Sequence, residues 1–184
     1  HNLVNYLDDA LTSIINEPGL GSDYEIVLSD NSVSSEIQNL YKKKYIHYFG
    51  IYYYRSLNYD SLDANVNRAV ELAKGKYVWI FGDDDLIVPG AIISIIKYLK
   101  KHEPSILVVN SQSFGRKGII EKKRVPFKNN LIYNDKEDNV FLADFGSYLT
   151  YIGGIVVNKE LWIENFDKSK IGSYFAHLDV LFKI

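Results

Sequence analysis

The sequence contains no cysteine and no methionine. Without cysteine, disulfide bonds and thiol catalysis are excluded. No run of residues approaches the ~20 consecutive apolar residues that a membrane-spanning helix needs. The net charge of −2 gives no indication of a nucleic-acid-binding surface. The remaining composition is that of an ordinary globular protein, 47% hydrophobic and 24% charged, and 184 residues suit one domain with a sizeable core.

The chain begins at His1, and a chain of this length normally contains several methionines. We therefore expect that residues precede His1 and that methionines are missing from the sequence as printed. Missing residues would shorten some of the spacings discussed below by one. An intact mass of the purified protein tests this expectation.

Segments with helical spacing of apolar residues alternate with short β-rich runs over the first 110 residues. We expect these elements in chain order: helix 3–15, strand 24–30, helix 36–43, strand 50–56, helix 61–75, strand 76–82, helix 89–101 and strand 105–110. The strand runs are too continuously apolar for a sheet with one face in water. The pattern therefore predicts an α/β fold with a mainly parallel sheet covered by helices on both faces.

The alternation stops after residue 110. Residues 115–130 are typical of a basic hairpin or loop, with an anion-binding loop as the less favoured interpretation. Residues 151–162 predict a strand followed by a short helix, and 173–184 predict an amphipathic helix that closes the chain.

Three consecutive aspartates, Asp83, Asp84 and Asp85, directly follow the apolar strand at 76–82. The carboxyl ends of strands are where α/β proteins place their sites. Adjacent carboxylates repel one another, and partial burial raises their pKa unless a cation offsets the charge. Oxygen ligands favour Mg²⁺ or Mn²⁺. The alternative is a polar turn in which Asp85 caps the following helix, which accounts for one aspartate and not for three.

A second acidic turn ends the strand at 24–30 with Asp30. Alone, this turn is typical of an Asx-turn that leads into a helix capped by Ser34 or Ser35. If the two acidic strand ends face one crevice, Asp30 can instead accept hydrogen bonds from a nucleobase. Both interpretations stay open on the residues alone.

These motifs together resemble the nucleotide-sugar-binding half of family 2 glycosyltransferases of the GT-A fold. The resemblance rests on "YEIVLSDNSVSSE" and "RSLNYDSLDANVNRAVELAKGKYVWIFGDDDLIVPGAI" and covers roughly residues 3–110. Within the family, the sequence is most similar to bacterial enzymes that build lipopolysaccharide or capsular polysaccharide, including abequosyltransferase-like members. The resemblance implies a nucleotide-sugar-binding half at 1–110 and an incomplete acceptor-side half at 111–184. It also implies a sheet that lacks the family's first strand, which would leave a gap.

The resemblance implies roles for the acidic residues. Asp30 matches the aspartate that reads the base, commonly uracil. Asp83 and Asp84 match the aspartates that contact the ribose and hold a divalent metal on the diphosphate, with Asp85 as a further metal ligand. Gly82 departs from the family pattern, because many members have the first aspartate of the motif at this position.

Other site residues follow from the same resemblance. Asn58 and Asn65 match positions that flank the donor pocket. Arg55 is placed to reach the diphosphate, although a solvated arginine at a strand end fits its position equally well. Asp60 occupies a position that is often glycine, which puts the local turn in question.

The candidate general base is Asp179 in "AHLDVLF", with His177 standing where the family places an acidic residue. On the residues alone, a solvent-facing helix position fits Asp179 equally well. His177 is better interpreted as a packed or surface histidine. Tyr148, Tyr151 and Tyr174 are weak candidates for stacking on a sugar.

The implied activity is the inverting transfer of a hexose or deoxyhexose from a nucleoside-diphosphate donor, with a UDP-sugar favoured, to a saccharide or lipid-linked acceptor in surface polysaccharide synthesis. The implied cofactor is Mg²⁺ or Mn²⁺. The implied location is the cytoplasm, including the inner face of the membrane. Two alternatives stay open: a sugar nucleotidylyltransferase, and an inactive nucleotide-sugar-binding or scaffold domain.

Overall fold

The computed structural model describes residues 3–19, 21–56, 61–115, 118–121, 123–134 and 136–184. Helices and strands alternate along most of the chain, as the apolar spacing predicts. In chain order the elements are α1 (Leu3–Ile15), β1 (Ile26–Asp30), α2 (Glu36–Leu40), a π-helical turn (Tyr41–Tyr45), β2 (Ile51–Arg55), α3 (Leu62–Leu72), β3 (Tyr77–Trp79), α4 (Ala91–His102), β4 (Ile106–Val108), β5 (Ser113–Gly115), β6 (Gly118–Glu121), α5 (Asp138–Phe145), two 3₁₀ turns (Tyr148–Thr150 and Ile152–Gly154), β7 (Ile155–Asn158), α6 (Lys159–Asn165), a 3₁₀ turn (Lys168–Lys170) and α7 (Ala176–Leu181).

The strands form a mixed layer in which both directions occur. Strands β1 and β2 pair in parallel, from Ile26 opposite Ile51 to Asp30 opposite Arg55. Strand β7 lies between β3 and β4 and runs antiparallel to both, so β3 and β4 run in the same direction. The predicted α/β class is therefore confirmed, with one antiparallel strand inserted. Among the described residues no strand pairing joins β1 to β3.

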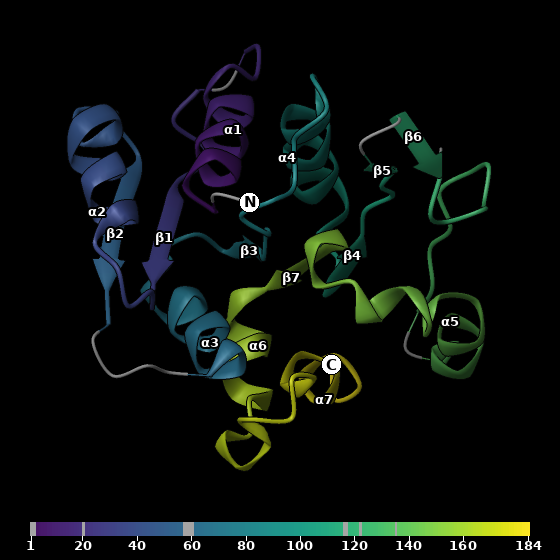
Figure 1. Ribbon diagram of the computed structural model, residues 1–184. Helices are drawn as coiled ribbons and strands as arrows, with labels where there is room; N and C mark the ends of the chain where they lie inside the picture. The colour runs from purple at the N-terminus through teal and green to yellow at the C-terminus, as the bar shows by residue number, and fades with distance from the viewer. Residues whose placement is uncertain (1–2, 20, 57–60, 116–117, 122, 135) are drawn as a thin grey trace.

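Helices cover both sides of this layer. In Figure 1, α1 and α4 lie on one side of the strands, and α3 and α6 lie on the other. A smaller core forms where α1 meets β1 and β2, around Leu11 and Tyr45. A larger core forms where β3 and β7 meet α3, α6 and α7, around Val157, Trp162 and Val180. The antiparallel β5–β6 hairpin lies beyond β4. It overlaps the start of the segment 115–130, for which a basic hairpin or loop was predicted.

Several elements are shorter than the sequence predicts, for reasons that lie in distant contacts. Helix α3 ends at Leu72 because Ala73 is extended, and the Glu25 carboxylate then accepts the backbone N–H groups of Lys74 and Gly75. The closing helix, predicted over 173–184, is limited to α7 (Ala176–Leu181), because the segment before it forms a loop. Among the described residues, no helix has both the length and the apolar character that crossing a membrane requires.

Candidate active site

The three aspartates after β3 form what we call the acidic edge, defined as Asp83, Asp84 and Asp85. Asp83 and Asp84 are exposed, and Asp85 is half-buried. Desolvation, followed by the charges of Asp84 and Asp85, raises the pKa of Asp83. The predicted direction of this shift is therefore confirmed for Asp83. Its larger cause is loss of solvation, and the negative charges of the two neighbouring aspartates add to it.

Asp85 is held tightly from two sides. Tyr151 forms a hydrogen bond with the Asp85 carboxylate. Burial first, and this bond second, raise the pKa of the Tyr151 hydroxyl. A Cβ atom added to Gly153 would lie 2.6 Å from Oδ2 of Asp85, and one added to Gly82 would lie 2.8 Å from the same oxygen. The close approach of Asp85 explains why position 82 is glycine, because a side chain there would displace the acidic edge.

Two further contacts fix the segment that clamps Asp85. The indole N–H of Trp79 donates to the carbonyl oxygen of Gly153 at 2.8 Å, which ties the segment to β3. The guanidinium of Arg124 lies 4.6 Å from the centroid of the Tyr151 ring, at cation–π distance. Arg124 thus brings a positive charge beside the acidic edge from the loop that follows β6.

The alternative role of Asp85 as a helix cap is wrong. Gly90, with φ of +86°, is the N-terminal cap of α4. The buried Glu17 carboxylate accepts the free N–H groups instead, from Gly90 at 2.9 Å and from Ile92 at 3.1 Å. Because Glu17 satisfies the start of α4 from the segment after α1, Asp85 is available for another role.

Asp30 is buried at the end of β1. Its Oδ1 accepts the backbone N–H of Ser32 at 2.8 Å, which is an Asx-turn. Its Oδ2 accepts the Tyr53 hydroxyl and lies 3.9 Å from Nε of Arg55. Burial first, and the bond to Asp30 second, raise the pKa of Tyr53. The turn geometry is present, and the predicted contact with a nucleobase stays a prediction.

Arg55 is not a solvated strand-end arginine, because only 18% of its side chain is exposed. Its Nη2 donates to the carbonyl oxygens of Ser32, Val33 and Ser34, the last at 2.8 Å. The guanidinium therefore holds the loop after β1 against the end of β2. Its predicted contact with a diphosphate stays a prediction.

The two predicted asparagines have different outcomes. Asn65 on α3 accepts the Ser29 hydroxyl at 2.8 Å and donates to the Ser29 carbonyl oxygen at 2.9 Å, so it fixes α3 beside Asp30. Asn58 and Asp60 lie outside the described residues.

Asp179 and His177 both lie on α7 but differ in surroundings. Asp179 forms an ion pair with Lys183, with Oδ2 and Nζ 2.6 Å apart, and its side chain is 26% exposed. His177 is buried, as expected for a packed histidine. Of the candidate tyrosines, Tyr174 is exposed and Tyr148 packs edge-on against Phe145.

The predicted residues gather in three groups. Asp30, Arg55 and Asn65 meet where β1, β2 and α3 converge, the acidic edge follows β3, and Asp179 lies on α7. In the part of the chain that the structure describes, no hydrogen bond or ion pair joins one group to another. Nor do three acidic or histidine side chains there converge as ready-made metal ligands.

Sequence reasoning missed the residues that support the acidic edge. Tyr151 was considered for sugar stacking, whereas it contacts Asp85. Glu17 and Arg124 were not considered at all. The only local signal was the glycine pair that includes Gly153, because paired glycines indicate a close approach of the backbone to another group.

Helices on both sides of a mixed strand layer, with acidic residues after β1 and β3, define an α/β domain whose candidate sites lie at strand ends. The chain belongs to glycosyl transferase family 2, whose profile matches residues 1–156.

Two curated proteins are similar to the chain in sequence. Abequosyltransferase RfbV of Salmonella typhimurium is 28% identical over 201 residues, covering 100% of this chain and 58% of the relative. Poly(ribitol-phosphate) beta-glucosyltransferase of Bacillus spizizenii is 29% identical over 122 residues, covering 65% of this chain and 19% of the relative. The chain thus spans little more than half the length of the first relative.

Solved structures of S. aureus TarS share the fold. TarS 1-349 superposes with a TM-score of 0.73 at 18% identity, over 99% of this chain and 51% of TarS 1-349. The complex of TarS 1-349 with UDP-GlcNAc gives a TM-score of 0.65 at 16% identity, over 90% of this chain and 45% of the other. The predicted GT-A class of fold is confirmed by this likeness.

Proposed function

We propose that this chain is the core of an inverting glycosyltransferase of surface polysaccharide synthesis. It transfers a hexose or deoxyhexose from a nucleoside-diphosphate donor to a saccharide or lipid-linked acceptor, in the cytoplasm or at the inner face of the membrane. Residues 1–110 bind the nucleotide sugar, and residues 111–184 form the acceptor side. Family membership and the names of the two curated relatives support this proposal.

One observation carries the proposal: the acidic edge is exposed at Asp83 and Asp84 but rigidly held at Asp85. A cationic partner at these carboxylates would relieve the desolvation and the mutual repulsion that raise the pKa of Asp83. The clamp by Tyr151 and Gly153 fixes the backbone that carries them. A UDP-sugar is the favoured donor, and the complexes of TarS with UDP and UDP-GlcNAc support this choice.

The acidic edge fits a Mg²⁺ or Mn²⁺ ion. Magnesium commonly takes one or two protein carboxylates and completes its octahedron with water and phosphate oxygens, so the absence of a three-residue cluster among the described residues is compatible with it. Asp84 would hold the ion, with Asp83 and Asp85 beside it. When bound, the ion would supply positive charge against the departing diphosphate.

The group around Asp30 would bind the nucleoside. The Asp30 carboxylate retains unused lone pairs after its bonds to Ser32 and Tyr53. Its side chain is 1% exposed, so the loop after β1 has to move before these lone pairs can accept N–H groups of a base. Asn65 and Arg55 hold the surrounding loop and helix in place, and Arg55 adds positive charge near the diphosphate. The proposed place of Asn58 beside this pocket rests on the resemblance alone.

Asp179 is the proposed general base. Its carboxylate would take the proton of the acceptor hydroxyl while that oxygen bonds to the anomeric carbon. The bond from this carbon to the diphosphate breaks, and its electron pair leaves with the diphosphate. Attack from the opposite face inverts the anomeric configuration. Lys183 neutralises Asp179 in the free protein, so this ion pair has to open for the reaction.

The decisive experiment measures release of UDP from a panel of UDP-sugars by the full-length protein, for wild type and for Asp84→Asn. The substitution keeps the shape of the side chain and removes its charge. We expect it to lower the rate by about 10²–10³, the size typical of a lost electrostatic contact in a transition state.

Asp9→Asn is the matched control, because Asp9 is an exposed aspartate on α1. It should retain the wild-type rate. Full activity in Asp84→Asn would contradict the metal assignment. Absence of both UDP release and Mn²⁺-dependent UDP binding in the wild type would support a scaffold domain instead.

A further inference from the structure

The β5–β6 hairpin carries three large apolar side chains that are mostly in contact with water. Phe114 is 59% exposed, Ile119 is 57% exposed and Ile120 is 76% exposed. A single exposed apolar side chain is ordinary on a soluble protein, but several of them on one short hairpin form a patch. Exposed apolar patches with a polar rim mark surfaces that bind a protein or a membrane.

These side chains lie on both faces of the hairpin. Phe114 and Ile119 are opposite each other in the register, so their side chains share one face. Successive residues of a strand point to opposite faces, so Ile120 belongs to the other face, where its Cδ1 lies 3.0 Å from the place of a Cβ atom on Gly115. A protein that covered one face would leave the other in water. The apolar layer of a membrane surrounds both.

The sequence around the hairpin is strongly basic. Residues 113–128 contain six lysine and arginine residues and a single glutamate, although the whole chain has a net charge of −2. These cations come before and after the apolar pair Ile119 and Ile120 in sequence, and they are Arg116, Lys117, Lys122, Lys123, Arg124 and Lys128. Apolar side chains bordered by cations are complementary to a bilayer surface, where acyl chains lie beneath anionic phosphates.

The base of the hairpin is fixed to the sheet. The side chain of Asn110 accepts the backbone N–H of Val125 at 3.0 Å and donates to its carbonyl oxygen at 3.0 Å. The backbone N–H of Arg124 donates to the carbonyl oxygen of Ser111 at 2.8 Å. The chain is thus bonded to the end of β4 just after the hairpin, and Figure 1 shows the hairpin beyond β4, on the side away from β1 and β2.

One residue connects this base to the acidic edge. The guanidinium of Arg124 lies 4.6 Å from the centroid of the Tyr151 ring, and Tyr151 bonds to Asp85. A membrane bound by the hairpin would therefore lie at a set position relative to the acidic edge, as a lipid-linked acceptor requires. This use of the hairpin rests on the proposed function, whereas binding of a membrane does not.

We propose that the β5–β6 hairpin is a membrane-binding element that places Phe114, Ile119 and Ile120 among the acyl chains of a bilayer containing anionic phospholipid. Lys123 and the neighbouring lysine and arginine residues contact the headgroup phosphates. Their long side chains can keep the charge at the phosphates while their stems lie along apolar surface.

The test measures co-sedimentation of the full-length wild-type protein with vesicles. One preparation is phosphatidylcholine alone, and the other is phosphatidylcholine with an equal amount of phosphatidylglycerol. We expect binding to the mixed vesicles and little binding to phosphatidylcholine, because stable anchoring takes an apolar and an electrostatic contribution together. Added salt should weaken the binding, since it screens the charges. Absence of binding to the mixed vesicles overturns the proposal.

Substitutions separate the two contributions. Ile119→Gln combined with Ile120→Gln should weaken binding to mixed vesicles about 10-fold or more, because two apolar side chains no longer leave water. Phe49→Gln, at an apolar residue that is 89% exposed before β2, is the matched control and should bind like wild type. Lys123→Gln should weaken binding about 5-fold, and Lys43→Gln, at an exposed lysine, should not. Equal losses in a variant and its control overturn the assignment to the hairpin.

Insertion itself is measured by fluorescence. The emission of Phe114→Trp should shift to shorter wavelength when mixed vesicles are added, and that of Phe49→Trp should not. Binding without this shift overturns insertion. A wild type that binds no vesicle but forms a dimer, which the double glutamine variant abolishes, would assign the hairpin to a second copy of the chain instead.

The outcomes for the hairpin and for the proposed function are distinguishable. Vesicle binding by a wild type that releases no UDP supports the membrane-binding hairpin and contradicts the proposed transferase. UDP release by a wild type that binds no vesicle overturns the hairpin proposal alone.

Discussion

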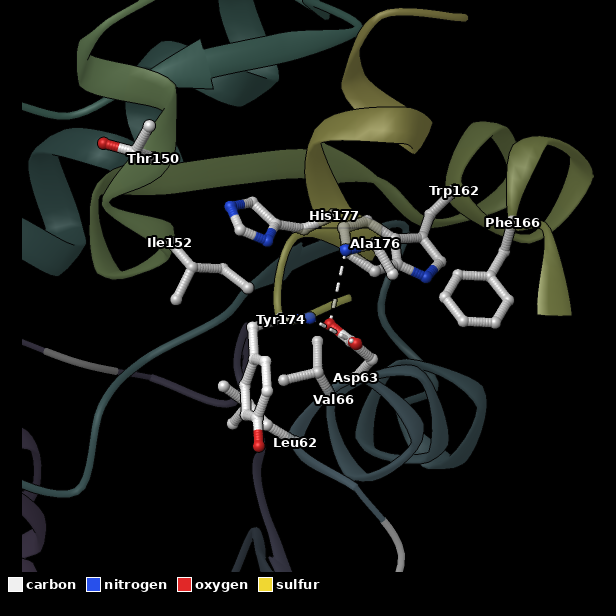
Figure 2. Close-up of a pocket in the computed structure, with 10 residues that line it drawn as sticks. All are labelled: Leu62, Asp63, Val66, Thr150, Ile152, Trp162, Phe166, Tyr174, Ala176 and His177. Atoms are coloured by element: carbon white, nitrogen blue, oxygen red, sulfur yellow. Dashed lines mark hydrogen bonds between the residues drawn. The ribbon is translucent and has the colours of Figure 1, made fainter. Parts of the chain in front are cut away.

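At the acidic edge, Asp83 and Asp84 are exposed to solvent, whereas Asp63 and His177, on α3 and α7, are buried (Figure 2). Because the carboxylates of the acidic edge are in contact with water, cations in solution can reach them directly. In the buried region, the Asp63 carboxylate is satisfied from within the protein by three backbone N–H groups. Each region is held by a residue that binds no ligand itself, Tyr151 at the edge and Asp63 in the buried region. At the acidic edge, the side chain that holds the structure in place is therefore different from the side chains proposed to contact a ligand.

The largest effect should come from Asp63→Ala, which disrupts the buried region and spares the acidic edge. Three backbone N–H groups lose a charged acceptor, and hydrogen bonds to charged groups are worth about 1.5–3 kcal/mol each. We expect the free energy of unfolding to fall by about 4 kcal/mol, measured by urea denaturation. Asp9→Ala should change it by less than about 0.5 kcal/mol. A change below about 1 kcal/mol in Asp63→Ala would show that the loop before α7 is held by other contacts.

An intermediate effect is expected from Gly153→Ala, which disturbs the segment that clamps Asp85 at the acidic edge. The new methyl group would lie 2.6 Å from Oδ2 of Asp85 and 2.8 Å from the Tyr151 hydroxyl. Overpacking of this kind costs about 1–3 kcal/mol of unfolding free energy, and the binding of UDP with Mn²⁺ should weaken in parallel. Gly21→Ala is the control, since no atom lies within 4 Å of its added methyl group. Equal stability of the two variants would mean that the clamp on Asp85 is loose.

The smallest effect concerns pH and sharpens the contrast between exposed and buried ionisable groups. Burial lowers the pKa of His177 in the folded protein, despite the nearby Asp63 carboxylate. As pH falls, His177 therefore binds a proton in the unfolded chain at a higher pH than in the folded protein. This contribution to stability is complete above the unfolded pKa of about 6.5 and is lost as pH falls below it, by at most about 1.4 kcal/mol per pH unit.

Denaturation curves of wild type and His177→Phe between pH 7.5 and pH 5 measure this term. The difference in slope between the two proteins should appear only below about pH 6.5. His102→Phe, at an exposed histidine, should keep the wild-type slope. Parallel curves for wild type and His177→Phe would show that His177 titrates alike in the folded and unfolded states.

Local patterns were sufficient to predict much of the fold and half of the candidate site. The apolar spacing of 3–15 predicts α1 because one face of a helix repeats every 3.6 residues, and Asp30 and Asp83 were found as charges at the ends of apolar strands. The position of β7 was not predictable. A run such as that from Ile155 to Asn158 indicates a buried strand but carries no information on its neighbours.

The support of the site was missed because it depends on contacts between distant residues. The Glu17 carboxylate accepts the backbone N–H of Gly90, and the Asp63 carboxylate accepts that of Ala176. The members of each pair lie far apart in the sequence, so no local pattern connects them. Likewise, the sequence left open whether His177 is packed or at the surface, and it could not show that one of its nitrogens would lack a partner. Such contacts are set by tertiary packing, which overrides local propensity.

The insertion of β7 between β3 and β4 also sets the order in which the protein can fold. Tyr77 and Ile106 have to wait for partners near residue 157, so the central strands cannot pair while the first two thirds of the chain emerge from the ribosome. During that time β3 and β4 have bare edges that other chains can join. Since Gly153 lies two residues before the start of β7, Asp85 acquires its clamp in the same late step. A nascent chain therefore has no rigid acidic edge until nearly all of the described chain has been synthesised.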